Sequence, residues 1–125
     1  YSYFYLFRNG IYLDANSDSI PPSEFGNYFY NEYNSNSELR LNIKSNKRIW
    51  GLYKVENNII YIEQYKPMIY SRMPSYTSQG IILNDSTIIF IANYRSKNNK
   101  ECKILNATVH FIPCKLKPDS ICKFF

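Results

Sequence analysis

The segment from Trp50 to Tyr65 constrains the fold more than any other part of the sequence. Two alternating runs flank Asn57-Asn58, and asparagine tolerates the positive φ that both central positions of a type I′ turn demand. Closing a hairpin over these two residues separates an apolar face from a polar face, and a register shift by one residue would destroy this sorting. The apolar face collects Tyr53, Val55, Ile60 and Ile62, and the polar face collects Lys54, Glu56, Tyr61 and Glu63.

Two further pairs of apolar runs flank turn signals in the same way. Asn84-Asp85 separates residues 78–83 from 86–94, and Asn9-Gly10 separates residues 3–8 from 11–14. The first of these hairpins is apolar on both faces, which is typical of central strands covered on both sides. Its register places Ile82 and Ile89 on one face and Ile81, Ile88 and Phe90 on the other.

The remaining elements complete an all-β chain. Strands are expected at residues 39–44 and 102–112, and one short helix at 23–33, with Ser23 as N-cap and Phe25 stacked over Phe29. Residues 65–79 contain Pro67 and Pro74 and predict a long irregular connection or a broken edge strand. The sequence therefore predicts an antiparallel meander of about eight strands with at most one short helix, forming either a small barrel or a strongly curved sheet.

Length and composition set the outer limits. The 125 residues suffice for a single domain, spanning 1–125, and a content of 45% apolar residues excludes a disordered chain. The longest unbroken apolar run is residues 88–92, which is far too short for a transmembrane helix. The sequence therefore predicts no transmembrane segment.

The sequence offers little material for catalysis or metal binding. It has no glycine-rich phosphate loop, no G-x-S-x-G and no paired-acid motif, and the spacing of its three cysteines and single histidine is not that of a zinc site. His110 falls on the polar face of its strand with no aspartate nearby in sequence. We therefore expect a protein that is not an enzyme and holds no cofactor or metal.

The net charge of +5 is concentrated in the last 35 residues. Residues 1–90 carry equal numbers of basic and acidic side chains, whereas residues 91–125 carry seven basic and two acidic ones. The basic residues there are not interleaved with aromatic side chains as a nucleic-acid stacking platform requires. We interpret them as a solvated edge and tail, and expect no nucleic-acid partner.

Two stretches together resemble a known kind of domain. Phe7-Arg8-Asn9-Gly10-Ile11-Tyr12, followed by Trp50-Gly51-Leu52-Tyr53-Lys54-Val55 and its turn, is similar to small lipocalin-like domains exported by Bacteroidetes, commonly lipoproteins. The segment 80–86 fits the same pattern. The resemblance implies a cell-envelope or extracellular address, a lipid anchor upstream of Tyr1 and at most a binding role. Classical lipocalins carry a G-x-W motif near the first strand, whereas here Trp50 precedes Gly51 in mid-chain. The family's cavity-lining residues therefore cannot be transferred one by one.

The connection after the central hairpin is the expected ligand site. It carries apolar, aromatic and cationic groups, and long connections often border binding sites. Its residues should lie near the rim of the predicted barrel at which Trp50 sits. Around an open interior they would form a collar suited to an apolar ligand with an acidic head, and over a filled interior they would form a packed plug. The predicted ligand-binding residues are Trp50, Tyr53, Met68, Tyr70 and Arg72.

The redox state of the cysteines depends on the cellular compartment of the protein. Cys102 and Cys114 sit near the two ends of one strand, beyond disulfide reach, whereas Cys114 and Cys122 flank the turn signal Pro118-Asp119. An exported chain would hold a Cys114–Cys122 disulfide and a free Cys102, and a cytosolic chain would hold three thiols.

Three classes of function stay open on the sequence alone. The leading hypothesis is a non-enzymatic exported domain that binds a small apolar or amphipathic ligand or a partner protein. The alternatives are a small nucleic-acid-binding barrel, motivated by the isoelectric point near 9.1, and a purely structural or assembly subunit. The chain begins with Tyr1 rather than methionine, so we expect that a segment preceding it has been removed.

Overall fold

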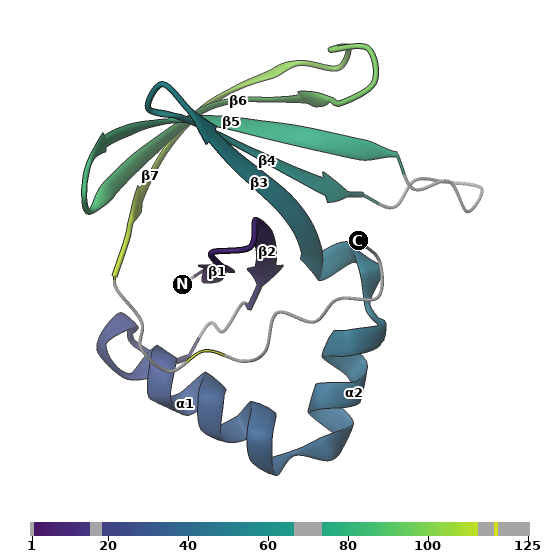
Figure 1. Cartoon of the computed structure of the whole chain (residues 1–125), viewed down its shortest axis with the longest axis vertical. Helices are drawn as coiled ribbons and strands as arrows, with labels where there is room; N and C mark the ends of the chain where they lie inside the picture. The colour runs from purple at the N-terminus through teal and green to yellow at the C-terminus, as the bar shows by residue number, and fades with distance from the viewer. Residues whose placement is uncertain (1, 16–18, 67–73, 113–116, 118–125) are drawn as a thin grey trace.

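One antiparallel sheet of seven strands, in chain order from β1 to β7, forms the body of the protein in a computed structural model (Figure 1). The structure describes residues 2–15, 19–66, 74–112 and 117. The sheet curves strongly, which confirms the predicted all-β meander as a curved sheet. In chain order the elements are β1 (Phe4–Leu6), β2 (Ile11–Asp14), α1 (Pro22–Ser35), α2 (Ser37–Ser45), the 3₁₀ turn η1 (Lys47–Ile49), β3 (Trp50–Glu56), β4 (Ile59–Tyr65), β5 (Ser75–Asn84), β6 (Thr87–Arg95) and β7 (Lys103–His110).

The central hairpin has the predicted register. Strands β3 and β4 pair Val55 with Ile60 and Tyr53 with Ile62. Asn57 and Asn58 both adopt positive φ, at 50° and 63°, as a type I′ turn requires. The structure therefore confirms both the turn and the pairing.

The hairpin of β1 and β2 closes over three residues rather than the predicted two. The Gly10 amide donates to the Phe7 carbonyl at 3.0 Å, and the Phe7 amide donates to the Ile11 carbonyl at 2.9 Å. Gly10 has φ of 83°, so the loop has the character of a tight turn followed by a left-handed residue. The Asn-Gly signal correctly located the turn, but the glycine serves as the bulge residue instead of the second turn residue.

The register predicted for the hairpin of β5 and β6 is wrong by one residue. Asn84 pairs with Thr87, so the turn is Asp85-Ser86, and the Asn84 side chain accepts hydrogen bonds from the Ser86 amide and hydroxyl. Irregularities between Gln79 and Gly80 and between Ile82 and Asn84 shift the pairing further. Ile82 therefore pairs with Ile88 and Ile81 with Ile89, and the face that carries Ile81 is not fully covered, since that side chain is 39% exposed.

Residues 75–79 belong to β5 and pair on both sides, with β4 and with β6. Over this part, both predicted alternatives are wrong, because residues 75–79 form neither an irregular connection nor an edge strand. Met68, Tyr70 and Arg72 lie outside the described residues. The strand predicted at 102–112 is confirmed as β7.

Helix α1 confirms the predicted helix and extends it at both ends. It begins after Pro21 with no side-chain cap, so Ser23 does not act as the N-cap. Phe25 and Phe29 stack one turn apart, with ring centroids 5.6 Å from each other, as expected.

The strand predicted at residues 39–44 is instead helix α2, so the described chain holds two short helices rather than one. Asn36 caps the helix by accepting a hydrogen bond from the Leu39 amide at 3.0 Å. Leu39 and Ile43 are one helical turn apart and face the core, whereas Leu41 is 67% exposed. Helical spacing, not strand alternation, decides which of these apolar side chains is buried.

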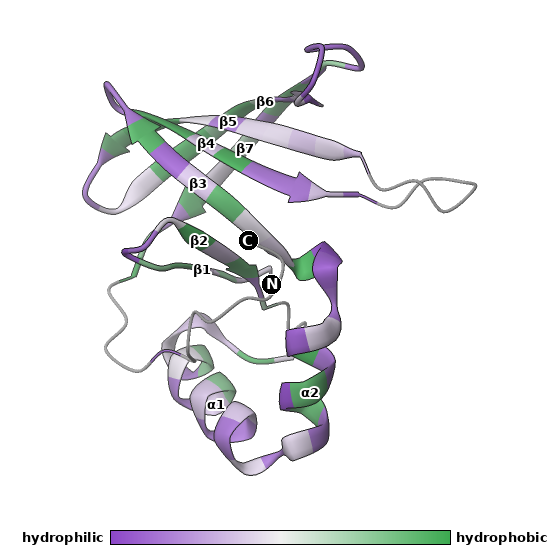
Figure 2. Ribbon diagram, turned by 45° about the vertical axis from the view of Figure 1, so that its right-hand side comes forward, coloured by the Kyte–Doolittle hydropathy of each residue, from purple (hydrophilic) through white to green (hydrophobic). Residues whose placement is uncertain are grey.

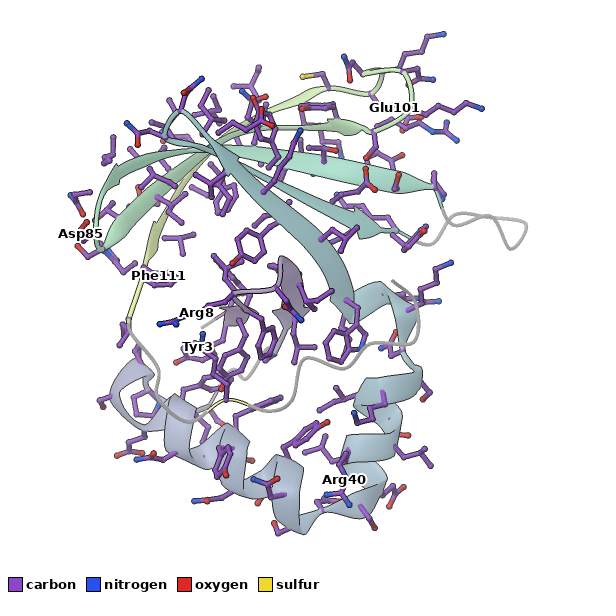
Figure 3. All side chains as sticks on the ribbon, viewed as in Figure 1. Tyr3, Arg8, Arg40, Asp85, Glu101 and Phe111 are labelled. Atoms are coloured by element: carbon purple, nitrogen blue, oxygen red, sulfur yellow. The ribbon has the colours of Figure 1, made fainter. Side chains whose placement is uncertain are left out.

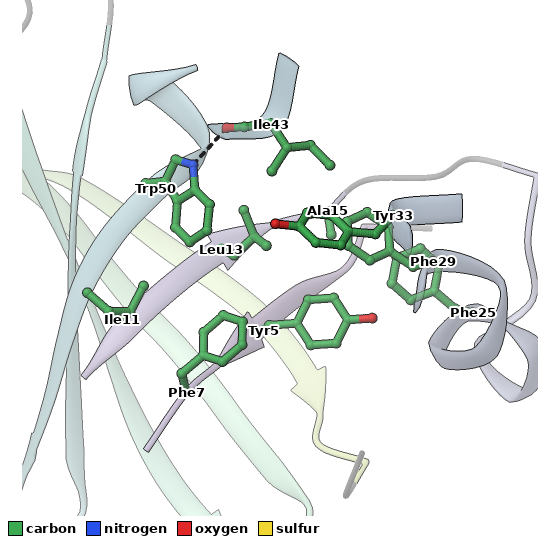
Figure 4. Close-up of a cluster of buried hydrophobic side chains, with 10 residues drawn as sticks. All are labelled: Tyr5, Phe7, Ile11, Leu13, Ala15, Phe25, Phe29, Tyr33, Ile43 and Trp50. Atoms are coloured by element: carbon green, nitrogen blue, oxygen red, sulfur yellow. Dashed lines mark hydrogen bonds between the residues drawn. The ribbon is translucent and has the colours of Figure 1, made fainter. Parts of the chain in front are cut away.

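Strands β1 and β2 lie between the helices and the rest of the sheet (Figures 1 and 2). Two apolar clusters therefore form, one on each side of them. The helix-side cluster, most of which Figure 4 shows between β1–β3 and the helices, consists of Tyr5, Phe7, Ile11, Leu13, Ala15, Phe25, Phe29, Tyr33, Ile43 and Trp50. The inner cluster, on the concave side of the sheet, consists of Tyr12, Ile60, Ile62, Ile88 and Phe90.

No helix in the described part of the chain is long and apolar enough to cross a bilayer.

The register of the central hairpin predicts how two neighbouring substitutions differ. Ile62 is 3% exposed within the inner cluster, so Ile62→Asp should lower the free energy of unfolding by about 3 kcal/mol or more, because it buries an unpaired carboxylate. Glu63 faces the other side of β4, and Glu63→Lys should cost less than about 1 kcal/mol. Urea denaturation followed by circular dichroism measures both, and a larger loss for Glu63→Lys would contradict the assignment of the faces.

Candidate functional site

A cavity of about 190 Å³ lies on the concave side of the sheet. Its walls come from five different strands, β1, β2, β4, β5 and β6, and from the edge strand β7. The lining residues are Phe4, Tyr12, Ile62, Gln64, Ser78, Phe90 and Val109. The cavity is therefore mostly apolar, with uncharged polar groups on three lining residues, Tyr12, Gln64 and Ser78, which is the usual character of a small-molecule site.

Residues directly opposite each other on paired strands share a face of the sheet, so the pairing orders the concave face into rows. One row is apolar and contains Ile60, Gly80 and Phe90. The next row, toward the turn between β6 and β7, changes from apolar to cationic across the sheet. It contains Ile62, Ser78, Asn93 and Lys103.

The row beyond it is polar and contains Gln64, Tyr76 and Arg95. The Tyr76 hydroxyl donates to a Glu101 carboxylate oxygen, and Arg95 lies 4.0 Å from the other oxygen of that carboxylate. Glu101 lies at the end of the sheet opposite the Asp85 turn (Figure 3). The concave face is thus apolar toward Asp85 and charged toward Glu101.

Gly80 sets how closely the apolar row packs. A Cβ atom at this position would lie 3.1 Å from a side-chain carbon of Ile60, 3.1 Å from a ring carbon of Phe90 and 3.0 Å from a methyl group of Ile88. These distances are tighter than ordinary van der Waals contacts. The missing side chain therefore lets three large apolar residues meet beside the cavity.

Strands β1 and β2 supply the wall opposite the main sheet. The Phe4 ring lies 5.3 Å from the Tyr12 ring and, across the concave side, 6.5 Å from the Phe90 ring in an edge-on arrangement. Burial, and secondarily the nearby Asp14 carboxylate, raise the pKa of Tyr12 well above its usual range. The Tyr12 phenol therefore stays neutral at the cavity wall.

A hydrogen-bonded chain borders the polar end of the cavity. The Lys66 ammonium donates to the side-chain oxygen of Asn93 at 3.0 Å, and the Asn93 amide nitrogen donates to the Ser78 hydroxyl at 2.9 Å. Asn93 is buried, and these bonds satisfy an amide that would otherwise be costly to bury. The Lys66 ammonium also lies 4.9 Å from the centroid of the Tyr76 ring.

Two cations lie near each other at this end. Partial burial, and then the charge of Lys103, lower the pKa of Lys66 from its ordinary value. Lys103, on β7, pairs with Asn93, on β6, and Lys66 follows the end of β4. Asn93 therefore lies between the two lysines across the sheet.

The structure separates the two described members of the predicted ligand-binding group. Trp50 is fully buried in the helix-side cluster, where its indole N–H donates to the Ile43 carbonyl at 2.8 Å (Figure 4). Tyr53 packs against the inner cluster, and its hydroxyl donates to the Phe7 carbonyl at 2.6 Å. The other three members, Met68, Tyr70 and Arg72, lie outside the described residues, so the collar stays a prediction.

The predicted disulfide also stays a prediction. Cys114 and Cys122 lie outside the described residues, and Cys102 is exposed with a free thiol. Among the described residues, no group of three His, Cys, Asp or Glu side chains could hold a metal ion.

Sequence reasoning did not identify the cavity residues as a site. Ser78 and Gly80 were the available signal, because two small residues at alternate positions of one strand make room beside their neighbours on the same face. Their positions opposite Ile62 and Ile60 follow only from the pairing of β4 with β5.

Comparison with known proteins finds no matching family model, no similar curated protein and no similar solved structure.

Most of the described basic residues in the last 35 positions flank the turn between β6 and β7. Arg95 ends β6 near Glu101, Lys97 and Lys100 occupy the exposed turn, and Lys103 begins β7. Lys117 lies apart from them and donates to the Leu6 carbonyl at 3.0 Å on the edge strand β1. Lys115 and Lys123 lie outside the described residues.

Because the basic residues of this region are not interleaved with aromatic residues, we predict that single-stranded DNA is not a partner. At physiological salt, fluorescence anisotropy with a labelled oligonucleotide should show no sub-micromolar binding, because nucleic-acid grooves align cations with stacking aromatics. Sub-micromolar binding that is abolished by neutralising Lys115 and Lys117 would contradict the prediction.

Proposed function

We propose that this chain is a non-enzymatic, exported, lipocalin-like domain that binds a small apolar or amphipathic ligand on the concave side of its sheet. The cavity bounded by Phe4, Tyr12, Ile62, Phe90 and Val109 carries the proposal. Six strands contribute to its lining, and aromatic rings form two of its walls. Concave apolar surface of this kind supplies binding free energy when a ligand displaces water from it.

The size of the cavity limits the ligand. Its volume of about 190 Å³ is below the range of drug-sized pockets, roughly 300–1,000 Å³. An apolar protein cavity of about 150 Å³ is large enough to hold benzene. A single ring with a short chain therefore fits best.

The export and lipoprotein parts of the proposal rest on the resemblance of the segments around Asn9-Gly10 and Trp50-Gly51. A signal peptide with a lipoprotein cysteine in the coding sequence before Tyr1 would support them.

A matched pair of substitutions on β7 tests the cavity. Val109 lines the cavity, whereas Ile104, on the same strand, packs against neither apolar cluster and is 85% exposed. Val109→Phe should fill the cavity and weaken binding of the neutral ligand 4-phenylbutanol by about tenfold or more, and Ile104→Phe should leave its affinity unchanged.

Two-dimensional NMR titration of the labelled protein measures the affinity and locates the contact through the amides of Ile62, Ser78 and Phe90. Trp50 fluorescence is a poor reporter because its ring lies in the helix-side cluster. Absence of any shift at these amides, or equal binding by both variants, would contradict a ligand site in the cavity.

A further inference from the structure

We infer that the ligand is a small organic anion whose apolar body occupies the cavity and whose carboxylate lies between Lys66 and Lys103. This inference rests on the proposed function and adds the charge of the ligand. It starts from the row of the sheet in which the apolar lining ends and the cations begin.

The first step is the position of Lys66 relative to the cavity. Its ammonium bonds to Asn93, and Asn93 bonds to the Ser78 hydroxyl that lines the cavity. Lys66 directly follows the end of β4, the strand that carries the lining residue Gln64, and its bond to Asn93 fixes its position beside the concave face. The ammonium therefore stands two hydrogen bonds away from the cavity wall.

The second step is the position of Lys103. It pairs with Asn93 across β6 and β7, so it projects from the same concave face as Asn93 and Ser78. Lys66 donates to Asn93 and Lys103 pairs with Asn93, so both lysines lie beside the same buried amide, and the charge of Lys103 helps to lower the pKa of Lys66.

The third step is the absence of a compensating carboxylate. Among residues 2–15, 19–66 and 74–112, neither lysine forms an ion pair, and Lys66 bonds to a neutral amide. Glu101, the acidic residue at this end of the face, is already engaged by Tyr76 and Arg95. Two neighbouring cations repel each other, and a bound anion would remove this repulsion.

The fourth step is the chemistry of the ligand. Ammonium groups donate strong, charge-assisted hydrogen bonds to a carboxylate, and the mostly apolar lining of the cavity suits an apolar group. An aromatic or aliphatic body with a short spacer and one terminal carboxylate matches this arrangement. The structure therefore favours a monocarboxylate over a neutral or cationic molecule of the same shape.

The experiment compares 4-phenylbutyrate with its neutral analogue 4-phenylbutanol by calorimetry and NMR titration. The wild-type protein should bind the carboxylate about tenfold more tightly than the alcohol. The double variant Lys66→Gln/Lys103→Gln should lose this preference and keep its affinity for the alcohol. Neither lysine belongs to the apolar clusters, and the glutamine side-chain NH₂ group of the Lys66→Gln variant can still donate to Asn93, so the substitutions leave the core intact. Unchanged alcohol binding verifies the fold of the variant.

A matched control separates local recognition from net charge. Lys97→Gln/Lys100→Gln removes the same charge from the exposed turn between β6 and β7 and should retain the preference for the carboxylate. Loss of the preference in this control as well would overturn the assignment of the carboxylate to Lys66 and Lys103.

The remaining outcomes distinguish the two proposals. Equal affinity of the wild-type protein for both compounds would overturn the anion inference and leave the proposed cavity function standing. Absence of binding for both compounds would overturn the proposed function together with the inference.

Discussion

The burial of β1 and β2 on both faces is the constraint on which the rest of the structure depends. Leu13 is fully buried toward the helices, and its neighbour Tyr12 is buried toward the concave side of the sheet. Two short strands thus join both apolar clusters. Helices α1 and α2 cover one side of the hairpin, and Trp50 anchors α2 to the start of β3 through its bond to the Ile43 carbonyl.

This constraint also creates the cavity. Because one face of the hairpin is held against the helices, its other face brings Phe4 and Tyr12 opposite Phe90 on the main sheet. Gly80 lets the neighbouring apolar row pack closely, while the small Ser78 side chain in the next row borders open space. In the proposed binding of a ligand, the helices would act by positioning the wall that the hairpin provides.

The proposed ligand reflects the same geometry. Apolar rows stabilise the sheet at the end near Asp85, where few polar side chains face inward. Near Glu101 the rows become polar, and the hydrogen-bonded chain of Lys66, Asn93 and Ser78 lies at the boundary between the apolar part and the polar part of the face. The proposed amphipathic anion would lie along this face of the sheet, with its apolar body toward the Asp85 end and its carboxylate toward the Glu101 end.

The sequence by itself determined what short-range pairing controls. The register of β3 and β4 followed from Asn57-Asn58 and two alternating runs, because a tight turn fixes the pairing of the strands it joins. The α1 aromatic stack followed from local spacing for the same reason. Tertiary structure decided the rest. In residues 39–44 apolar and polar side chains alternate, but packing of Leu39 and Ile43 against the other core residues selected a helix. The irregularities of β5, and with them the cavity beside Ser78, depend on pairing with β4 and β6, which no local pattern specifies.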